Sequence, residues 1–214
     1  MKELDTNQKF ELFLDEVKRG GKKPKILVHV CCGPCATYPL TRLAEVFDVT
    51  VIFINPNIYP EEEYEKRFAE LKRFIKEDRL NISLIKLSYD HRSYLDYIKG
   101  YEDEKEGGKR CELCYKFRIE LGMKYASENG FPYFLTVMTI SAKKPSKLLN
   151  EIGCSLSSKY VSTAYVSTDF KKKDGTLKGI KIAKAFNLYR QDYCGCEFSY
   201  RARQSYLEQK KHIN

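Results

Sequence analysis

The sequence contains no tryptophan, only three histidines and three methionines, and no apolar run long enough to cross a membrane. Residues 1–23 are charged throughout and lack the apolar block of a secretory signal peptide. Internal repeats and low-complexity tracts are absent as well, which argues against solenoid and linker-like chains. We therefore expect a globular cytoplasmic protein that does not associate with membranes.

The composition favours a folded domain with an anionic partner. A chain of 214 residues with 43% hydrophobic residues can bury one sizeable α/β core, so global disorder is excluded. Lysine and arginine number 38 against 29 aspartates and glutamates, which gives a net charge of +9. This excess favours nucleic acid as a partner, although a lysine-rich soluble surface explains it equally well.

Short apolar segments alternate with amphipathic segments along much of the chain. The apolar segments predict strands at residues 25–30, 49–54, 82–87 and 133–138. Helices are expected around them at residues 7–18, 36–46, 61–76, 94–98, 111–128, 145–157, 180–188 and 197–211. Because apolar strands separated by helices are typical of parallel sheets, the sequence predicts an α/β fold with a doubly wound, mainly parallel sheet flanked by helices.

The apolar periodicity weakens after about residue 158. We therefore predict a Rossmann-like α/β domain over residues 1–157, which carries a group of cysteines. Residues 158–214 are predicted to form a helical C-terminal extension that packs on the same domain, because they contain too few apolar residues for a core of their own.

Eight cysteines in a cytoplasmic protein indicate metal or redox chemistry rather than a disulfide scaffold. Cys31, Cys32 and Cys35 follow the first strand, and Cys111 and Cys114 begin a later helix. In a doubly wound sheet the first and fourth strands flank the switch point, so the two groups can meet. Five thiols suffice for an iron–sulfur or zinc site with four thiolate ligands. A single buried cysteine is usually a small hydrophobe, but this pairing favours a metal, and adjacent cysteines fit structural zinc poorly.

The segment Cys194-Gly195-Cys196 is a different kind of feature. Two cysteines separated by one residue can close into a strained ring that is easily reduced, which suits an electron relay. The same thiols could instead be further metal ligands, and the spacing leaves both interpretations open. Cys154 stands alone on a predicted helix, so we expect it in the core.

Several polar residues are candidates for substrate or RNA contacts. Tyr189 and Arg190 precede the redox-capable pair, where an arginine can bind phosphate and a tyrosine can stack on a base. Polar side chains also follow the second strand, namely Asn55, Asn57 and Tyr59. The lysines of residues 171–173 favour a solvated surface, and His29, within a strand, is more typical of a hydrogen-bonded core histidine.

Six sequence blocks, taken together, resemble the QueH-type epoxyqueuosine reductases over residues 26–199. They read VHVCCGPC, NPNIYPEEEYEKR, RCELCYKFR, TISAKK, STDFKKKDG and YRQDYCGCEFS. The resemblance implies a fold similar to that of HUP and PP-loop ATPases. It also implies reduction of epoxyqueuosine to queuosine at the wobble position of tRNA by an oxidoreductase. The CCGPC loop stands where those ATPases bind phosphate, and its cysteines argue against the use of ATP.

The resemblance also implies cofactors and residue roles. The expected cofactor is a 4Fe-4S cluster, with room for a second, adjacent iron, and the partners are the anticodon arm of tRNA and an electron donor. Cluster ligands carry over to Cys31, Cys32, Cys111 and Cys114, with Cys35 as a replacement ligand or a ligand of the second iron. Cys194 and Cys196 carry over as the redox-active pair. Asp169 is our candidate for a proton donor or substrate-orienting residue.

Two alternative functions follow from the same features. A PP-loop-like tRNA sulfur-transfer enzyme would share the fold and the cysteines but would consume ATP. A non-enzymatic RNA-binding module would hold zinc in place of iron and sulfide.

Overall fold

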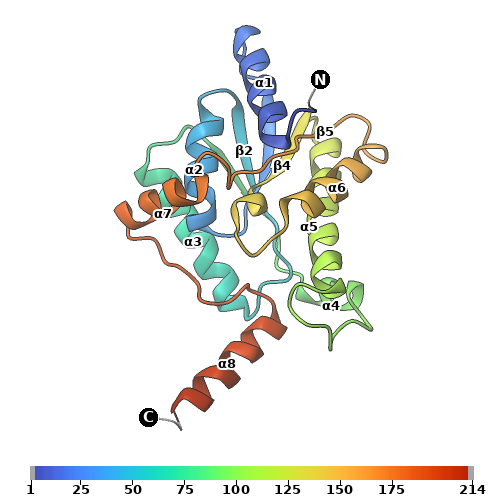
Figure 1. Ribbon diagram of the computed structural model, residues 1–214, viewed down its shortest axis with the longest axis vertical. Helices are drawn as coiled ribbons and strands as arrows, with labels where there is room; N and C mark the ends of the chain where they lie inside the picture. Colours follow the sequence, from blue (N-terminus) through green and yellow to red (C-terminus); the bar gives the residue numbers. More distant parts are fainter. Residues whose placement is uncertain (1–2, 212–214) are drawn as a thin grey trace.

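Five parallel strands form the central sheet of the computed structural model, which describes residues 3–211 (Figure 1). Their order in the sheet is β3-β2-β1-β4-β5. The first three strands are added toward one edge of the sheet, and the chain then crosses back to place β4 on the other side of β1. This order confirms the predicted doubly wound parallel sheet. The strands comprise β1 (Lys25–His29), β2 (Asp48–Phe53), β3 (Ser83–Lys86), β4 (Tyr133–Thr136) and β5 (Ala164–Tyr165).

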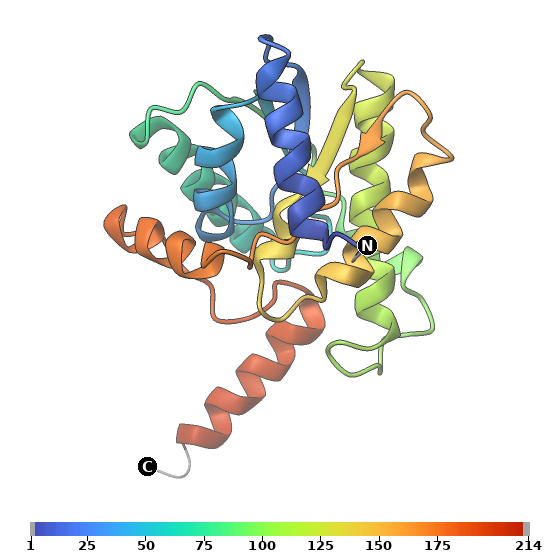
Figure 2. The same cartoon turned by 45° about the horizontal axis from the view of Figure 1, so that its top comes forward.

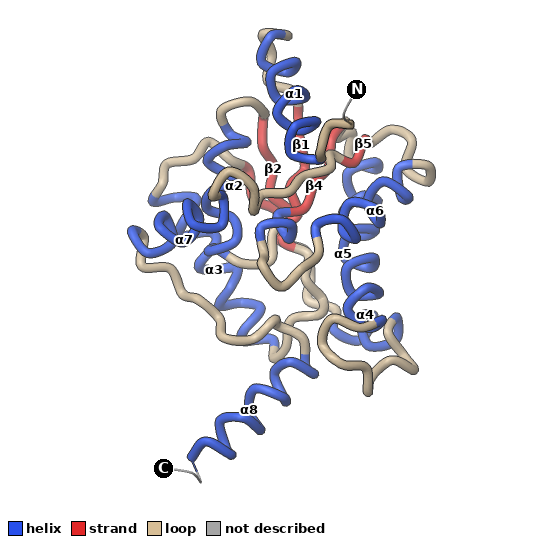
Figure 3. Tube along the Cα trace, viewed as in Figure 1, coloured by secondary structure: helices blue, strands red, loops and turns tan. Residues whose placement is uncertain are grey.

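Helices cover both faces of the sheet (Figures 2 and 3). Ile26 and Val28 of β1 belong to the apolar core beneath α1, α2 and α3, whereas Leu27 belongs to the core beneath α5 and α6. Burial on both faces explains why the strands are apolar without alternation. These helices comprise α1 (Thr6–Arg19), α2 (Gly33–Ala44), α3 (Glu61–Glu77), α5 (Lys109–Glu128) and α6 (Ser146–Ser157).

The remaining elements surround the carboxyl ends of the strands. A short α4 (His91–Tyr97) precedes α5, and a 3-10 turn, η1 (Val137–Ile140), follows β4. Helix α7 (Gly175–Ala185) packs against α2, where the Thr37 hydroxyl donates to the Gly179 carbonyl at 3.1 Å. Among the described residues, no helix is both long enough and apolar enough to cross a membrane.

Several elements differ from the sequence-based expectation. Helix α2 begins at Gly33 rather than at residue 36, and α4 begins at His91 rather than at residue 94. The fourth strand ends at Thr136, because residues 137–140 turn into η1. The two-residue β5 was not predicted, since two residues carry no periodicity. Helix α7 begins at Gly175 rather than at residue 180, and a side chain at Gly175 would overlap the Phe170 carbonyl. Glycines therefore let α7 pack closely against adjacent segments, but they also weaken the apolar periodicity from which the start of the helix was predicted.

The last helix, α8 (Glu197–Lys211), projects from the body of the protein (Figures 1 and 2). Ser199 is the residue of α8 that is buried, and the rest of the helix is exposed or half-buried. The division of the chain at residues 157 and 158 stays a prediction. The sheet itself extends past that boundary, because β5 pairs with β4.

Gly153 in α6 lies against the ring of Tyr165 in β5, and a Cβ atom there would overlap the ring. We expect Gly153→Ala to lower the free energy of unfolding by about 1–3 kcal/mol, since overpacking forces the surrounding atoms to shift. Chemical denaturation measures this change. Cys154→Ala is the matched control, because Cys154 is exposed on the same helix. Equal stability of the two variants would contradict the close packing at Gly153.

Candidate metal and redox site

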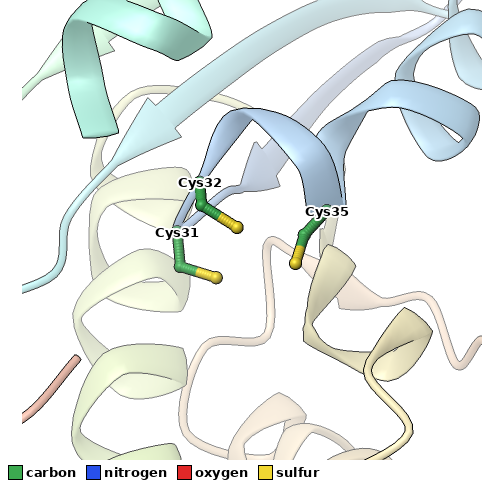
Figure 4. A group of neighbouring side chains, drawn as sticks. All are labelled: Cys31, Cys32 and Cys35. Atoms are coloured by element: carbon green, nitrogen blue, oxygen red, sulfur yellow. The ribbon is translucent and has the colours of Figure 1, made fainter. Parts of the chain in front are cut away.

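Three thiols lie together at the carboxyl end of β1. The sulfur atoms of Cys31, Cys32 and Cys35 all lie within 4.8 Å of one another. Cys32 is the N-cap of α2, and Figure 4 shows the three side chains directed toward a common space. The first turn of a helix has unpaired N–H groups and a partial positive charge, both of which favour thiolates. The turn therefore presents a preformed set of sulfur ligands.

A second pair of thiols lies in the first two turns of α5. A cavity of about 750 Å³ is lined by Cys31 and Cys35 from one segment, Cys111 from α5 and Cys194 from the C-terminal part. Cys114 is buried, 8% exposed, and packs in one apolar cluster with Cys196. The sheet order thus brings Cys31, Cys35 and Cys111 of the two predicted groups to one cavity, whereas Cys32 and Cys114 do not line it. Among the described residues, however, only the trio around Cys31 has all its ligand atoms within 4.8 Å.

Two buried arginines lie beside these thiols, and each has one guanidinium nitrogen without a hydrogen-bond partner. The guanidinium of Arg118 is 2% exposed, donates to Asn55 Oδ1 at 2.7 Å, and has no hydrogen-bond partner for its Nε. Arg67, 1% exposed, donates to Glu63 at 2.7 Å and to the Cys194 carbonyl at 3.2 Å, and its Nη2 has no partner. A buried charge without a counterion is costly. Glu63 is the counterion of Arg67, whereas Arg118 forms no ion pair with a carboxylate of the described residues and therefore requires other negative charge nearby. Thiolates that hold a metal group would supply it, and the residues present therefore fit such a group.

Burial and neighbouring charges also determine which of the thiols ionises most readily. Hydrogen bonds from Cys32 and Cys35, together with the positive charge of Arg118, hold the pKa of Cys31 well below its usual range. Burial raises the pKa of the Cys114 thiol to about 12. Cys31 is therefore the first thiol of the trio to ionise, whereas Cys114 needs a bound cation to become a thiolate.

We expect Arg118→Gln to weaken metal retention by about 10–100-fold, the usual cost of removing a group that supports metal ligands. The variant removes the buried positive charge that faces Cys31 and Cys114. Iron release to a chelator, followed over time, measures the effect. Lys116→Gln removes an exposed charge from the same helix and should retain metal like the parent protein. Equal retention in both variants would show that Arg118 does not stabilise the bound form.

The Cys194–Cys196 segment is fixed against α3 and the loop after β2. The Tyr59 N–H donates to the Gly195 carbonyl at 2.8 Å, and the Tyr193 hydroxyl donates to the Tyr59 carbonyl at 2.6 Å. Gly195 has a φ of +130°, and a side chain there would meet the Arg67 guanidinium. Cys194 is half-buried and faces the cavity, whereas Cys196 is buried. A rigid loop therefore holds one thiol of the pair at the cavity.

Comparison with known proteins identifies the family. The sequence model described as "Epoxyqueuosine reductase QueH" matches residues 26–202. The chain belongs to the QueH family. A relative from Streptococcus pyogenes with the same name is 36% identical over 83% of this chain and 71% of its own length. Similar matches come from Staphylococcus epidermidis, 36% over 87% and 80%, and from Thermotoga maritima, 34% over 81% and 89%.

The QueH match covers the cavity completely and leaves out the outer part of α8. Cys31, Cys35, Cys111 and Cys194 all fall within residues 26–202, whereas α8 continues to Lys211. The part of this chain that matches the family model is therefore the sheet domain with the residues that line its cavity.

The polar residues after β2 are buried parts of the QueH fold. Asn55 Oδ1 accepts hydrogen bonds from Arg118 and from His29 Nε2, the latter at 3.2 Å, and Asn55 donates to the Val30 carbonyl at 2.8 Å. Burial and the charge of Arg118 lower the pKa of His29 to about 3, so its imidazole is neutral. His29 is thus a hydrogen-bonded core histidine, as expected. Asn57 is 2% exposed, and neither asparagine lines the cavity.

Of the remaining candidates, the structure places only Arg190 at the cavity. The Tyr189 hydroxyl lies 3.0 Å from a Glu63 oxygen, and Lys66 Nζ covers the Tyr189 ring at 3.6 Å from its centre. Asp169 pairs with Lys171 at 3.1 Å and does not line the cavity. The expectation of a core position for Cys154 is wrong, because α6 buries the face that carries Leu149, Ile152 and Leu156.

Sequence reasoning missed the buried arginines Arg67 and Arg118 and the half-buried Lys144. Arginine and lysine are seldom buried, so composition gives no warning of such positions. The available signal was spacing, since Arg118 follows Cys114 by one helical turn and Arg67 follows Glu63 by one. Lys144 lies in the TISAKK block and lines the cavity.

Proposed function

We propose that this protein is an epoxyqueuosine reductase that converts epoxyqueuosine to queuosine at the wobble position of tRNA. Membership of the QueH family supports the reaction, and thiols from three separate segments around one cavity supply a place for it. That convergence of thiols is the observation that carries the proposal. Neither a sulfur-transfer enzyme nor a non-enzymatic zinc module is favoured by the relatives.

The proposed cofactor is a 4Fe-4S cluster held by Cys31, Cys32, Cys111 and Cys114. When bound, such a cluster transfers electrons one at a time. Arg67 and Arg118 would offset the negative charge of its thiolate ligands, which fits the guanidinium nitrogen of each that has no hydrogen-bond partner. Cys35 is proposed as a ligand of a second, adjacent iron or as a replacement ligand of the cluster, because its sulfur lies within 4.8 Å of those of Cys31 and Cys32.

The proposed reduction requires two electrons and two protons per epoxide. One C–O bond of each epoxide carbon breaks, a carbon–carbon double bond forms, and the oxygen leaves as water. The thiols of Cys194 and Cys196 can supply the whole requirement, because closing a disulfide releases two electrons and two protons. An external electron donor must then reduce the disulfide before the next turnover. Asp169 as a proton donor or substrate-orienting residue stays a prediction that its position does not favour.

The cavity also offers surfaces for a nucleoside. Tyr115 and Tyr193 line it together with the Cys194 thiol, and aromatic rings are the usual stacking partners of nucleic-acid bases. All eight cysteines have free thiols, which fits a reducing compartment, so we place the reaction in the cytoplasm.

The cofactor proposal is tested by elemental analysis of protein purified and reconstituted without oxygen. We expect iron and sulfide in equal amounts for the cluster, with an excess of one iron if the second site is filled, no dependence on zinc, and no consumption of ATP during turnover. Stoichiometric zinc with full RNA binding would favour the non-enzymatic module, and ATP consumption that depends on tRNA would favour sulfur transfer. Either result would contradict the reductase.

A further inference from the structure

We propose that three cations at the mouth of the thiol cavity, Lys143, Lys184 and Arg190, bind the RNA phosphates that flank the nucleotide entering the cavity. This inference rests on the proposed function and adds the surface that receives the RNA strand. The three residues are called the rim cations below. They come from three segments: the loop before α6, the end of α7 and the loop that leads to Cys194.

The shape of the site requires phosphates near its mouth. Cys31 is 8% exposed and lines the cavity, so a reacting group reaches its thiol only by entering the cavity. A volume of about 750 Å³ suits a single nucleoside rather than a folded RNA loop. An enzyme that acts on a base in such a recess must turn the nucleotide out of its stack. The phosphates on either side then remain outside, each with a negative charge beside the rim.

The rim cations are placed to meet those phosphates. Lys143 and Arg190 line the cavity and are exposed at its mouth. Ile180 and Ala183 of α7 also line it, and Lys184 stands one turn after Ile180 with its side chain exposed. Among the described residues, no carboxylate lies within 4.0 Å of any of the three cations, whereas Lys147 and Lys171 nearby are paired. Their charges are therefore available to a ligand.

Another segment of the cavity lining carries negative charge, whereas Asp192, which lines the cavity beside Arg190, is paired with Arg203. Glu106 and Gly107 line the cavity at the end of an exposed segment that also contains Glu102, Asp103 and Glu104. A polyanion is repelled by this segment and attracted to the rim cations. This asymmetry directs the RNA backbone along the side formed by α7 and the loop before α6.

The test compares two triple variants. The first replaces the rim cations (Lys143→Gln, Lys184→Gln, Arg190→Gln). The matched control replaces three exposed lysines near the amino end of β1, at the end of the strands opposite to the cavity (Lys18→Gln, Lys22→Gln, Lys25→Gln). Fluorescence anisotropy with an unmodified RNA hairpin that copies the anticodon arm gives the affinity across a salt series. Iron content, expected to be equal in both, verifies that each variant is folded.

We expect the rim variant to bind the hairpin at least about tenfold more weakly than the control. The slope of log affinity against log salt should also fall by about two, because three phosphate contacts to a single strand are lost. KM for tRNA should rise by more than kcat falls. Equal affinity and equal slope in the two triple variants would overturn the proposal.

Two further results distinguish RNA binding at the rim cations from binding of an electron donor there and from the proposed reductase activity. The rim variant could bind the hairpin normally and be reduced at the normal rate by dithionite but slowly by a protein electron donor. In that case the rim cations bind the electron donor, and the proposal is wrong. If the parent protein binds the hairpin through the rim cations yet leaves epoxyqueuosine unchanged, the rim is supported and the proposed reductase activity is refuted.

Discussion

Cys32→Ala is expected to abolish the visible absorption of the proposed iron–sulfur cluster together with all reductase activity. Cys32 is 1% exposed, caps α2 and lies within 4.8 Å of the sulfurs of Cys31 and Cys35. An alanine removes a thiolate from a site whose buried cations need negative charge, so both the ligand and the charge balance are lost. Absorption spectra and iron analysis of the reconstituted variant measure the effect.

The matched control for this variant is Cys154→Ala, which removes an exposed thiol outside the cavity and should retain the cluster. The ligands from α5 are tested in the same way. If Cys111→Ala and Cys114→Ala both kept full iron and activity, the proposed set of four ligands would be wrong. Cys35→Ala then decides between the two roles reserved for Cys35, because loss of one iron beyond the cluster would identify a second metal.

Cys194→Ala is expected to keep the cluster but to lower turnover by about a thousandfold or more, a loss typical of removing a residue that takes part in the chemistry. Cys194 is half-buried and lines the cavity, and the rest of its segment is fixed by Tyr59 and Arg67. The variant can no longer form the disulfide with Cys196 that would release two electrons and two protons. Iron content and steady-state turnover, measured on one preparation, separate the two effects.

Cys196→Ala should behave like Cys194→Ala if the two thiols act as a pair. Loss of iron in either variant would instead identify that cysteine as a metal ligand, which was the alternative role left open by the sequence. Serine at position 194 provides the control for side-chain volume, because it retains the size of the side chain without its redox chemistry.

The sequence was sufficient to predict the sheet and the meeting of its two cysteine groups. Apolar segments at residues 25–30 and 49–54 indicated strands buried on both faces, and the cysteine motifs followed the first strand and began a later helix. The adjacency of β1 and β4 then follows from the doubly wound topology. Local patterns were enough here because each depends on a few consecutive residues.

Features that depend on tertiary contacts could not be predicted in this way. The two residues of β5 form a strand because β4 offers them a free edge, and η1 begins where β4 ends. Arg118 is buried because Asn55 and the thiols surround it, which no spacing rule describes. Asp169 was placed near the chemistry from its position in a charged turn, yet its carboxylate pairs with Lys171 away from the cavity.

The most direct test of the proposed reductase is conversion of its substrate by the purified protein. The reconstituted protein is mixed without oxygen with dithionite and tRNA that carries epoxyqueuosine, and the digested nucleosides are analysed by mass spectrometry. We predict that epoxyqueuosine is replaced by queuosine, with the loss of one oxygen atom and without ATP. Unchanged epoxyqueuosine in the presence of a fully loaded cluster, or equal conversion by protein freed of iron, would contradict the proposal.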